Sequence, residues 1–337
     1  MSDTKWEGRM EAGKKRLATL VGCNYRNTSN ELHGCINDVV AMQRLLLSRF
    51  GFEAHNITLL TDEPDSPVQP TGSNIRRSLQ EMIRRADPGD VLLFHYSGHG
   101  TLLPAHGQSH QTFRSREEAI VPCDFNLITD VDFRHLVDQL PAGASFTMIS
   151  DSCHSGGLID KEKEQIGPST VLQSRTVAGM EKIQYRSKAR VIPFKAVLQY
   201  LATVSGIDSP EIGDHLSALF GREASLRFQP GARGVHRRTD DGILMSGCQS
   251  DETSADACPT GDPAEAYGAF SNALQMALRE VKGRIGNREL VKMVRKLLRE
   301  GEYEQHPCLY CSDENADAPF LWQPIISCER KERHSAT

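Results

Sequence analysis

Val91-Leu-Leu-Phe-His-Tyr-Ser-Gly-His99-Gly100 is an apolar run that stops at a glycine-rich turn, and Phe146-Thr-Met-Ile-Ser-Asp151-Ser-Cys153-His-Ser-Gly-Gly157 repeats that pattern. Both runs have the character of buried strands. The last polar side chains of each run are therefore expected at the carboxyl edge of a sheet, where open α/β sheets bind their ligands.

A histidine and a cysteine stand at these two strand ends. A thiol becomes an effective nucleophile when an imidazole lies within hydrogen-bond reach, and the same imidazole can protonate the amine that leaves. His99 precedes Cys153 by about 50 residues, the separation found in caspases, although the local caspase pentapeptide is absent. The two stretches together predict a cysteine peptidase with His99 and Cys153 as its catalytic pair.

The remaining periodicity predicts alternating strands and helices. Strands are expected at 16–23, 56–60, 91–96, 145–150 and 242–246, and amphipathic helices at 36–47, 74–85, 267–278 and 289–298. This alternation indicates an α/β fold, with a mainly parallel central sheet flanked by helices on both faces. From Asp160 to Thr239 the pattern weakens, which favours an inserted linker with one helical stretch at 194–201.

Composition narrows the class of protein. The chain has 337 residues, 39% hydrophobic and 25% charged, with a formal net charge of -5, which favours a soluble enzyme over a membrane or nucleic-acid-binding protein. The first ten residues lack the apolar segment of a signal peptide, so we expect a cytoplasmic location, with nuclear or extracellular presence left open. Nine cysteines, an odd count, favour reduced thiols.

Tyr96-Ser-Gly-His99-Gly100 and Asp151-Ser-Cys153-His-Ser-Gly156 resemble the two signature boxes of metacaspases, most closely those of the plant type II group. Similar segments at 16–25, 32–39, 119–124 and 242–248 extend the resemblance over nearly the whole chain. It implies a caspase-haemoglobinase-like fold, as one folded unit. It also implies a large (p20-like) catalytic subunit at 1–160, a linker with an autocleavage region at 161–239 and a small (p10-like) subunit at 240–337.

An acidic pocket for the substrate is expected beside the nucleophile. Side chains two apart on a strand share a face, so Asp151 should point the same way as Cys153, and Ser97 the same way as His99. A carboxylate in that position suits a cationic P1 side chain and opposes the Asp that animal caspases accept. We therefore predict cleavage after Arg or Lys.

The family resemblance adds Cys35 and Asp38 to this S1 pocket, and Asp251 and Glu252 are weaker candidates for it. A simpler interpretation stays open for two of the carboxylates. Asp151 could be a structural acceptor for loop amides, and Asp38 an ordinary charge on a helix face.

The expected mechanism begins with attack of Cys153 on the peptide carbonyl, with the backbone amides of Gly100 and Cys153 holding the oxyanion. His99 then protonates the departing amine and activates the water that hydrolyses the acyl-enzyme, so no cofactor is needed. His154 is expected to be a support rather than the base, because successive side chains of an extended strand diverge.

Arg186-Ser-Lys188-Ala-Arg190 offers three basic P1 positions within the expected linker. An enzyme of this specificity would cut its own exposed linker, which predicts a zymogen that processes itself. The resemblance selects Arg190 as the autocleavage site, with Lys188 and Arg186 as alternatives. A solvated basic loop is the other interpretation of this segment.

Calcium activates many metacaspases through a cluster of acidic residues. Asp130 and Asp160 resemble a remnant of that cluster, but Thr129 stands where the family has one of two paired Asp residues. Weak or absent calcium dependence and no bound metal are therefore expected. The expected partners are protein and peptide substrates with a basic P1 residue and protease inhibitors of the serpin or another type, and the expected oligomeric state is a monomer.

The resemblance also implies a role in programmed cell death or stress proteolysis. Two other functions remain open at the level of sequence: a catalytically silent scaffold with the caspase fold, and a legumain-like peptidase with another P1 preference. The intact pair of His99 and Cys153 opposes the scaffold, and the acidic surroundings oppose specificity for Asp.

Overall fold

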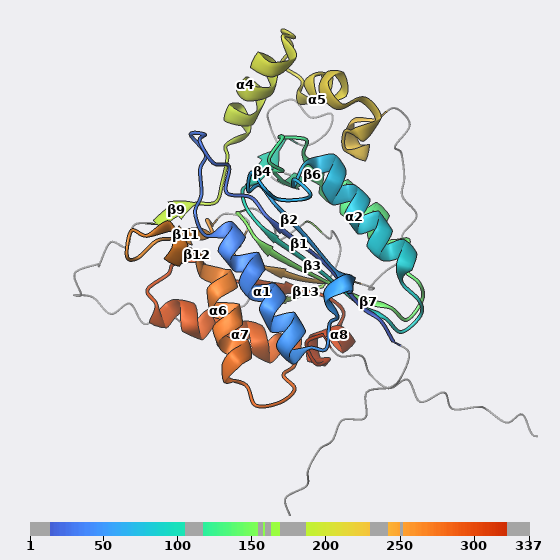
Figure 1. The fold of residues 1–337 in the computed structure, drawn as a ribbon, viewed down its shortest axis with the longest axis vertical. Coiled ribbons are helices and arrows are strands. Elements are labelled where there is room, and N and C mark those ends of the chain that lie inside the picture. Colours follow the sequence, from blue (N-terminus) through green and yellow to red (C-terminus); the bar gives the residue numbers. More distant parts are fainter. Residues whose placement is uncertain are drawn as a thin grey trace, which may run out of the picture.

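A seven-stranded sheet forms the centre of the molecule in a computed structural model, which describes residues 14–104, 117–153, 158, 163–168, 187–229, 242–249 and 252–321 (Figure 1). The strand order is β2-β1-β3-β7-β10-β13-β8. The bounds are β1 Arg16–Gly22, β2 Ile57–Thr61, β3 Val91–Ser97, β7 Ser145–Asp151, β8 Glu164–Ile166, β10 Gly242–Ser246 and β13 Cys308–Tyr310. The strands from β2 to β10 pair in parallel, and β13 and β8 add antiparallel pairs. The predicted mainly parallel sheet is confirmed.

Helices cover both faces of this sheet. One face packs against α1 (Cys35–Arg49), α6 (Ala269–Glu280), α7 (Asn287–Glu300) and α8 (Asp313–Asp317), and the other against α2 (Gly72–Arg85) and α3 (Asp130–Val137). Figure 1 shows α1, α6 and α7 on one side of the strands and α2 on the opposite side. Every residue of β3 is buried, since Leu93 faces the first helix layer while Leu92 and Phe94 face the second.

Two small sheets lie beyond the carboxyl edge of the central strands. One consists of β4 (Gly100–Leu103), β5 (Glu117–Ile120) and β6 (Ile128–Thr129), and the other of β9 (Ser187–Ala189), β11 (Ala255–Ala257) and β12 (Tyr267–Gly268). β4 begins just after β3 ends, so the turn between them, which carries His99, is fixed by strands on both sides.

The stretch 161–239 contains more regular structure than the sequence indicated. β8 joins the central sheet, β9 pairs with β11, and two helices follow, α4 (Phe194–Ser205) and α5 (Ile212–Phe220). The helix expected at 194–201 is present, whereas α5 was not anticipated. The division into large subunit, linker and small subunit stays a prediction.

Within the described part of the chain, no helix has the length and apolar character needed to cross a membrane.

Candidate active site

The two predicted strand ends lie side by side. β3 and β7 are neighbours in the sheet, with Ser97 opposite Asp151. In the turns that follow, Gly100 packs so closely on Cys153 that a Cβ atom at position 100 would collide with the Cys153 carbonyl oxygen. His99 and Cys153 therefore come from adjacent turns at the carboxyl edge of the sheet.

The His99 ring is held by Tyr25 and Asn30. The Tyr25 ring lies 4.7 Å from it between centroids, and the Tyr25 hydroxyl accepts a hydrogen bond from His99 N at 3.0 Å. His99 Nε2 lies 2.7 Å from the carbonyl oxygen of Asn30, so Nε2 carries the proton and donates. Nδ1 is left with its lone pair, and this buried atom has no hydrogen-bond partner among the described residues.

Burial lowers the pKa of His99 to about 4, although the hydrogen bond to Asn30 acts in the opposite direction. The imidazole is therefore neutral at physiological pH, as a general base must be.

The Cys153 thiol is buried beside a segment between β10 and β11. The backbone N–H of Ser254 donates to Cys153 Sγ at 3.0 Å. The hydroxyl of Ser254 donates to Asp151, so one residue contacts both the Cys153 thiol and the neighbouring carboxylate.

The backbone of Arg190 lies directly against these groups. Its carbonyl oxygen accepts hydrogen bonds from Gly100 N at 3.1 Å and Cys153 N at 3.2 Å, the two amides that the sequence predicts as oxyanion donors. Its own N–H donates to Ser254 O at 2.9 Å, and Ile192 N donates to Gly100 O at 3.1 Å. The chain from 190 to 192 is thus held across the site by backbone hydrogen bonds.

The guanidinium of Arg190 is fully buried among three carboxylates. Nη2 lies 2.9 Å from Oδ2 of Asp38 and 2.9 Å from Oδ1 of Asp256, and Nη1 lies 3.2 Å from Oδ2 of Asp151. Nη1 also donates to Ser97 Oγ at 2.7 Å. Three of the four predicted S1 residues, Asp38, Ser97 and Asp151, therefore contact one basic side chain.

Cys35, the fourth, is buried close to this group. Burial raises the pKa of its thiol well above the ordinary value, and the nearby Arg190 and the Ser97 hydroxyl oppose that effect. Cys35 therefore borders the charged residues as an uncharged thiol.

Backbone amides and a missing side chain make room for the carboxylates. Gly268 N donates to both oxygens of Asp38, at 2.9 and 3.0 Å, and Ser97 Oγ donates to Asp38 Oδ2 at 2.7 Å. A Cβ atom on Gly268 would collide with Asp151, Asp38 and the Arg190 guanidinium. Glycine at this position is a steric requirement of the pocket.

The pKa values of the carboxyl groups and of the Arg190 guanidinium depend on each other. Burial raises the pKa of Asp38 to about 7, and Arg190 limits that rise while Asp151 adds to it. Burial acts against the charge of Arg190 as well, but the carboxylates, Asp151 foremost, raise its pKa well above the ordinary value. A pocket of this kind is suited to a cation.

Two candidate residues of the pocket behave differently from the sequence-based expectation. Asp256, on β11, was not among the predicted residues but contacts Arg190 directly. Glu252, a weaker candidate for S1, places its carboxylate on His306, with Oε1 at 2.5 Å from Nδ1 and Oε2 at 2.8 Å from the backbone N. Asp251, His154, Asp160 and Arg186 lie outside the described residues.

Lys188 makes a second contact between the segment that contains Arg190 and the rest of the protein. Its ammonium group donates to the carbonyl oxygens of Ser29 at 3.1 Å and Glu31 at 2.8 Å. Since β9 pairs with β11, Lys188 is held as a residue two positions before Arg190 in an extended strand. This side chain is exposed, unlike that of Arg190.

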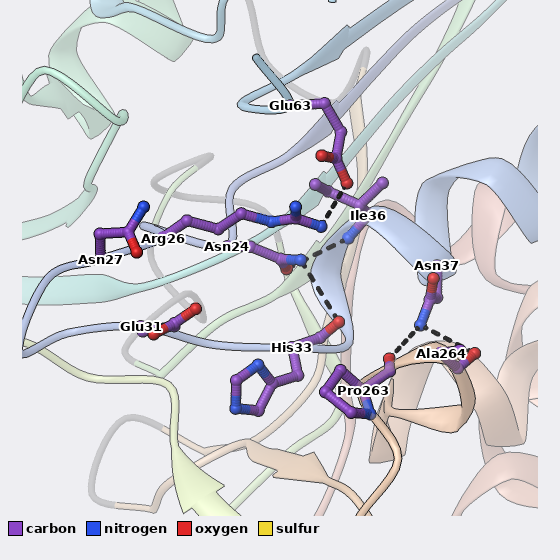
Figure 2. A pocket seen from close by; sticks show the side chains of 10 residues that line it. All are labelled: Asn24, Arg26, Asn27, Glu31, His33, Ile36, Asn37, Glu63, Pro263 and Ala264. Carbon is purple, nitrogen blue, oxygen red and sulfur yellow. Dashed lines mark hydrogen bonds and ion pairs between the residues drawn. The ribbon is translucent and has the colours of Figure 1, made fainter. Parts of the chain in front are cut away.

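The loop that holds Lys188 also borders a cavity of about 490 Å³. Figure 2 shows the side chains around it, including the ion pair of Arg26 and Glu63 and the hydrogen bonds of Asn37 to Pro263 and Ala264. The lining includes neither His99 nor Cys153, so the cavity is separate from these two side chains.

Asp130, one of the two predicted remnants of a calcium site, begins α3. Its Oδ2 lies 3.0 Å from Arg134 Nη2, and its Oδ1 accepts from Val131 N at 2.9 Å. In the described part of the chain, no cluster of three or more His, Cys, Asp or Glu residues is arranged to hold a metal ion. Calcium requires six to eight oxygen ligands, and the Asp130 carboxylate, already bound to Arg134 and to Val131 N, supplies too few by itself.

A thiol, a neutral imidazole and two amide donors around one peptide carbonyl are the parts of a cysteine-type peptidase. Comparison with known proteins agrees: residues 15–318 match the family model described as the caspase domain. The chain is 57% identical to Metacaspase-9 of Arabidopsis thaliana over 92% of its own length and 98% of that protein. It is 37% identical to Metacaspase-4 of Arabidopsis thaliana, over 91% and 99% of the two chains.

A solved structure of a protein from Geobacter sulfurreducens has the same fold, with a TM-score of 0.61 at 17% identity, covering 92% of this chain and 99% of that one. The fold and the family match together define a caspase-like cysteine-type endopeptidase. Within that class, the chain belongs to the metacaspases.

Proposed function

We propose that this peptidase cleaves after Arg or Lys, with Cys153 as nucleophile and His99 as acid and base, and that it is made as a zymogen which cuts its own Arg190–Val191 bond. One observation carries the proposal. Arg190 has its side chain among three carboxylates and its carbonyl oxygen between two amide donors, as a P1 residue of a bound substrate would have.

The catalytic steps follow from these positions. His99 Nδ1, the free ring nitrogen, takes the thiol proton as Cys153 Sγ attacks the P1 carbonyl carbon. The N–H groups of Gly100 and Cys153 hold the oxyanion, and the proton on Nδ1 passes to the departing amine. Water then hydrolyses the thioester, with His99 again as the base.

The preference for a basic P1 residue rests on charge. A guanidinium makes bidentate and planar contacts that match several carboxylates at once, and an ammonium group can replace it as a point charge. An Asp side chain would bring a fourth negative charge into a buried pocket, and an Asn side chain would leave the carboxylates without a cation. The pocket therefore opposes both caspase-like and legumain-like specificity.

Inhibition before processing is part of the same proposal. Because Arg190 fills the pocket and residues 187–189 pair with β11, an external substrate meets an occupied site. The chain thus carries its own first substrate. A catalytically silent scaffold with this fold would not require a nucleophile, a free imidazole nitrogen and an occupied P1 pocket together at one site.

Several properties of the enzyme are proposed on lesser support. Calcium is not required, because Asp130 is already paired with Arg134. Eight described cysteines are free thiols, which suits a reducing compartment such as the cytoplasm or the nucleus. We also propose action as a monomer, protein substrates and inhibitors that present a basic P1 residue, and a role in programmed cell death or stress proteolysis. Sedimentation of the purified enzyme and a fluorescent fusion in cells test the oligomeric state and the location.

The main experiment compares the purified chain with Cys153→Ala on fluorogenic peptides ending in Arg, Lys, Asp or Asn, each with calcium and with a chelator. We expect turnover of the Arg and Lys peptides, a cut after Arg190 found by mass spectrometry, and loss of both in the variant. Turnover of the Asp or Asn peptide alone would overturn the specificity, and an activity lost in chelator would overturn calcium independence. No turnover under any condition would support the scaffold.

A further inference from the structure

The segment that follows the proposed cut is anchored to the enzyme as firmly as the segment that precedes it. Val191 forms a parallel bridge with Gly100, and Ile192, 1% exposed, enters an apolar cluster with Leu103 of β4. From α4 and α5, the cluster receives Val197, Leu201, Ile212 and Leu216, and from the core side Ala119, Val121, Phe125 and Leu127. Residues 191–229 are called the docked module below.

Polar contacts secure the far end of the docked module. Arg227 Nε lies 2.9 Å from Glu117 Oε2, and Leu226 N donates to Asp132 Oδ1 at 2.9 Å. The carbonyl of Glu223 accepts from Asn126 Nδ2 at 2.7 Å. The interface therefore joins apolar burial at one end to charged and polar contacts at the other. Of the contacts named, only the bridge between Val191 and Gly100 uses the Arg190–Val191 bond, through the Arg190 carbonyl oxygen.

Cutting this bond does not release the amine that it creates. The residues before the cut return to the acidic pocket through Arg190 between turnovers of external substrate, and those after it stay attached through the docked module. We infer that the enzyme rejoins its own chain: the retained α-amino group of Val191 attacks the acyl-enzyme, and Arg190–Val191 is resynthesised, an intramolecular peptide ligase activity. This inference rests on the proposed function of Cys153 and His99.

The reaction balances without any added reagent. In the forward direction, the thioester between Arg190 C and Cys153 Sγ is attacked by water, which gives a carboxylate and a thiol. In reverse, Cys153 displaces water from the Arg190 carboxyl group to restore the thioester. The Val191 nitrogen then forms the C–N bond, the C–S bond breaks, and His99 accepts the amine proton and returns it to the sulfur.

The physical reason is entropic. Hydrolysis of a peptide bond is normally favoured in part because the two ends gain freedom, and here both ends remain ordered. A nucleophile held in line with its target has an effective molarity of about 10⁵ M or more, so a docked amine competes with water for the thioester. Processing should therefore reach a balance between cut and intact chains while the module stays docked.

Heavy-oxygen water provides the test. The self-processing enzyme is incubated in this water until the ratio of cut to intact chain is constant, and the intact band is digested with chymotrypsin in ordinary water. The peptide from Arg186 to Phe194 spans the bond. Heavy oxygen in its Arg190 carbonyl arises only when a hydrolysed bond has been remade, so we expect the label to accumulate there and an intact fraction to persist.

Two variants of α4 form a matched pair. Leu201 is buried in the docked module's interface and Val204 is 53% exposed. Leu201→Ala should lower the label in intact chains at least about tenfold and shift the balance toward cut chain, because a buried leucine contributes strongly to docking. Val204→Ala should leave both unchanged. Leu216→Ala repeats the test on α5 if Leu201→Ala yields no folded protein.

The hydrolysis of an Arg-ending fluorogenic peptide, measured in the same samples, separates this inference from the proposed function. Turnover of that peptide with no heavy oxygen in any intact chain would overturn the ligase activity and leave the peptidase standing. Equal labelling in Leu201→Ala and Val204→Ala would show that docking does not retain the amine. Absence of both turnover and self-cleavage would overturn the proposed function, and the ligase activity with it.

Discussion

Nη2 of Arg190 lies 2.9 Å from Oδ1 of Asp256, and these two residues lie on opposite sides of the proposed cut. Asp256 is itself fixed by two backbone amides, with His33 N donating to Oδ2 at 2.9 Å and Gly34 N donating to Oδ1 at 3.0 Å. The basic-residue pocket thus takes carboxylates from α1, β7 and β11, and it exists only where the three elements meet.

Asp256→Asn should weaken the binding of basic substrates. Removing one charge from a buried, hydrogen-bonded group should raise KM for an Arg-ending peptide at least about tenfold, with a smaller change in kcat. Glu252→Gln is the matched control, since Glu252 binds His306 outside the pocket. A KM that moves equally in both variants would contradict the placement of Asp256 in S1.

Gly268→Ala should close the pocket. The added methyl group would meet the Asp151 and Asp38 carboxylates and the guanidinium of the P1 residue, all of them fixed by buried contacts. The value of kcat/KM for Arg peptides should fall about a hundredfold or more, on the scale of a misplaced catalytic complex. Gly283→Ala, where the new methyl group meets open space, is the control and should retain activity.

Removing Arg190 should extend the pH range over which stability falls. In a Cys153→Ala background, Arg190→Ala leaves buried carboxylates without their cation, which costs about 3–5 kcal/mol of unfolding free energy at neutral pH. With Arg190 present, the folded-state pKa of Asp38 is about 7, above its ordinary 3.8, and without the cation it is higher still. The folded state therefore holds more protons than the unfolded state, and stability falls as pH rises from about 4 to 7.

Thermal unfolding measured from about pH 4 to well above pH 7 provides the test. Both proteins should lose stability alike up to about pH 7, and the difference in Tm between Arg190→Ala and its parent should widen above that value. A difference that is constant with pH would mean that the carboxylates do not remain buried and charged when Arg190 is removed.

Self-cleavage should persist in acid. His99 acts as a base only when neutral, and its folded-state pKa is about 4. Since Arg190 is already seated, the first-order rate of self-cleavage should decline only as pH falls through about 4. Stopped samples analysed on gels give the rate at each pH. A midpoint at 6.5, the ordinary value for histidine, would show that His99 is not desolvated in the zymogen.

A basic residue two positions before the P1 residue should help binding modestly. The ammonium group of Lys188 binds two carbonyl oxygens at the surface, where such contacts are partly screened by water. Peptides with Lys at P3 should therefore exceed the same peptides with Glu at P3 by about two- to tenfold in kcat/KM. Equal values for the two peptides would remove the loop at Ser29 and Glu31 from substrate recognition.

The central strands and the turns at their ends were predictable because each strand is a run of apolar residues that ends at residues typical of a turn. β3 and β7 are continuous apolar runs ended by glycine-rich turns, and this pattern alone predicts that His99 and Cys153 share one edge of the sheet. The same reasoning selected the amides of Gly100 and Cys153, which do contact a single carbonyl oxygen.

The missed residues lie where tertiary contacts, and not local pattern, decide the role. Asp256 stands on a three-residue strand, and nothing in the neighbouring sequence distinguishes it from Glu252, a weaker candidate for the pocket. Asn30 acts through its backbone carbonyl, which any residue type would supply. α5 is short, and its buried face is complete only when it packs against α4 in the shared apolar cluster, so its apolar spacing is a weak signal by itself.

The strand order interleaves the two parts of the chain that the proposed cut would separate. β7 and β8 precede the cut and β10 and β13 follow it, yet their order in the sheet is β7-β10-β13-β8. The later strands are enclosed on both sides by the earlier ones, so exchanging halves between molecules would require the sheet to be taken apart. If an active and an inactive variant of the enzyme were made in the same cell, they would not exchange their two parts. Each cut molecule would keep the two parts that folded together.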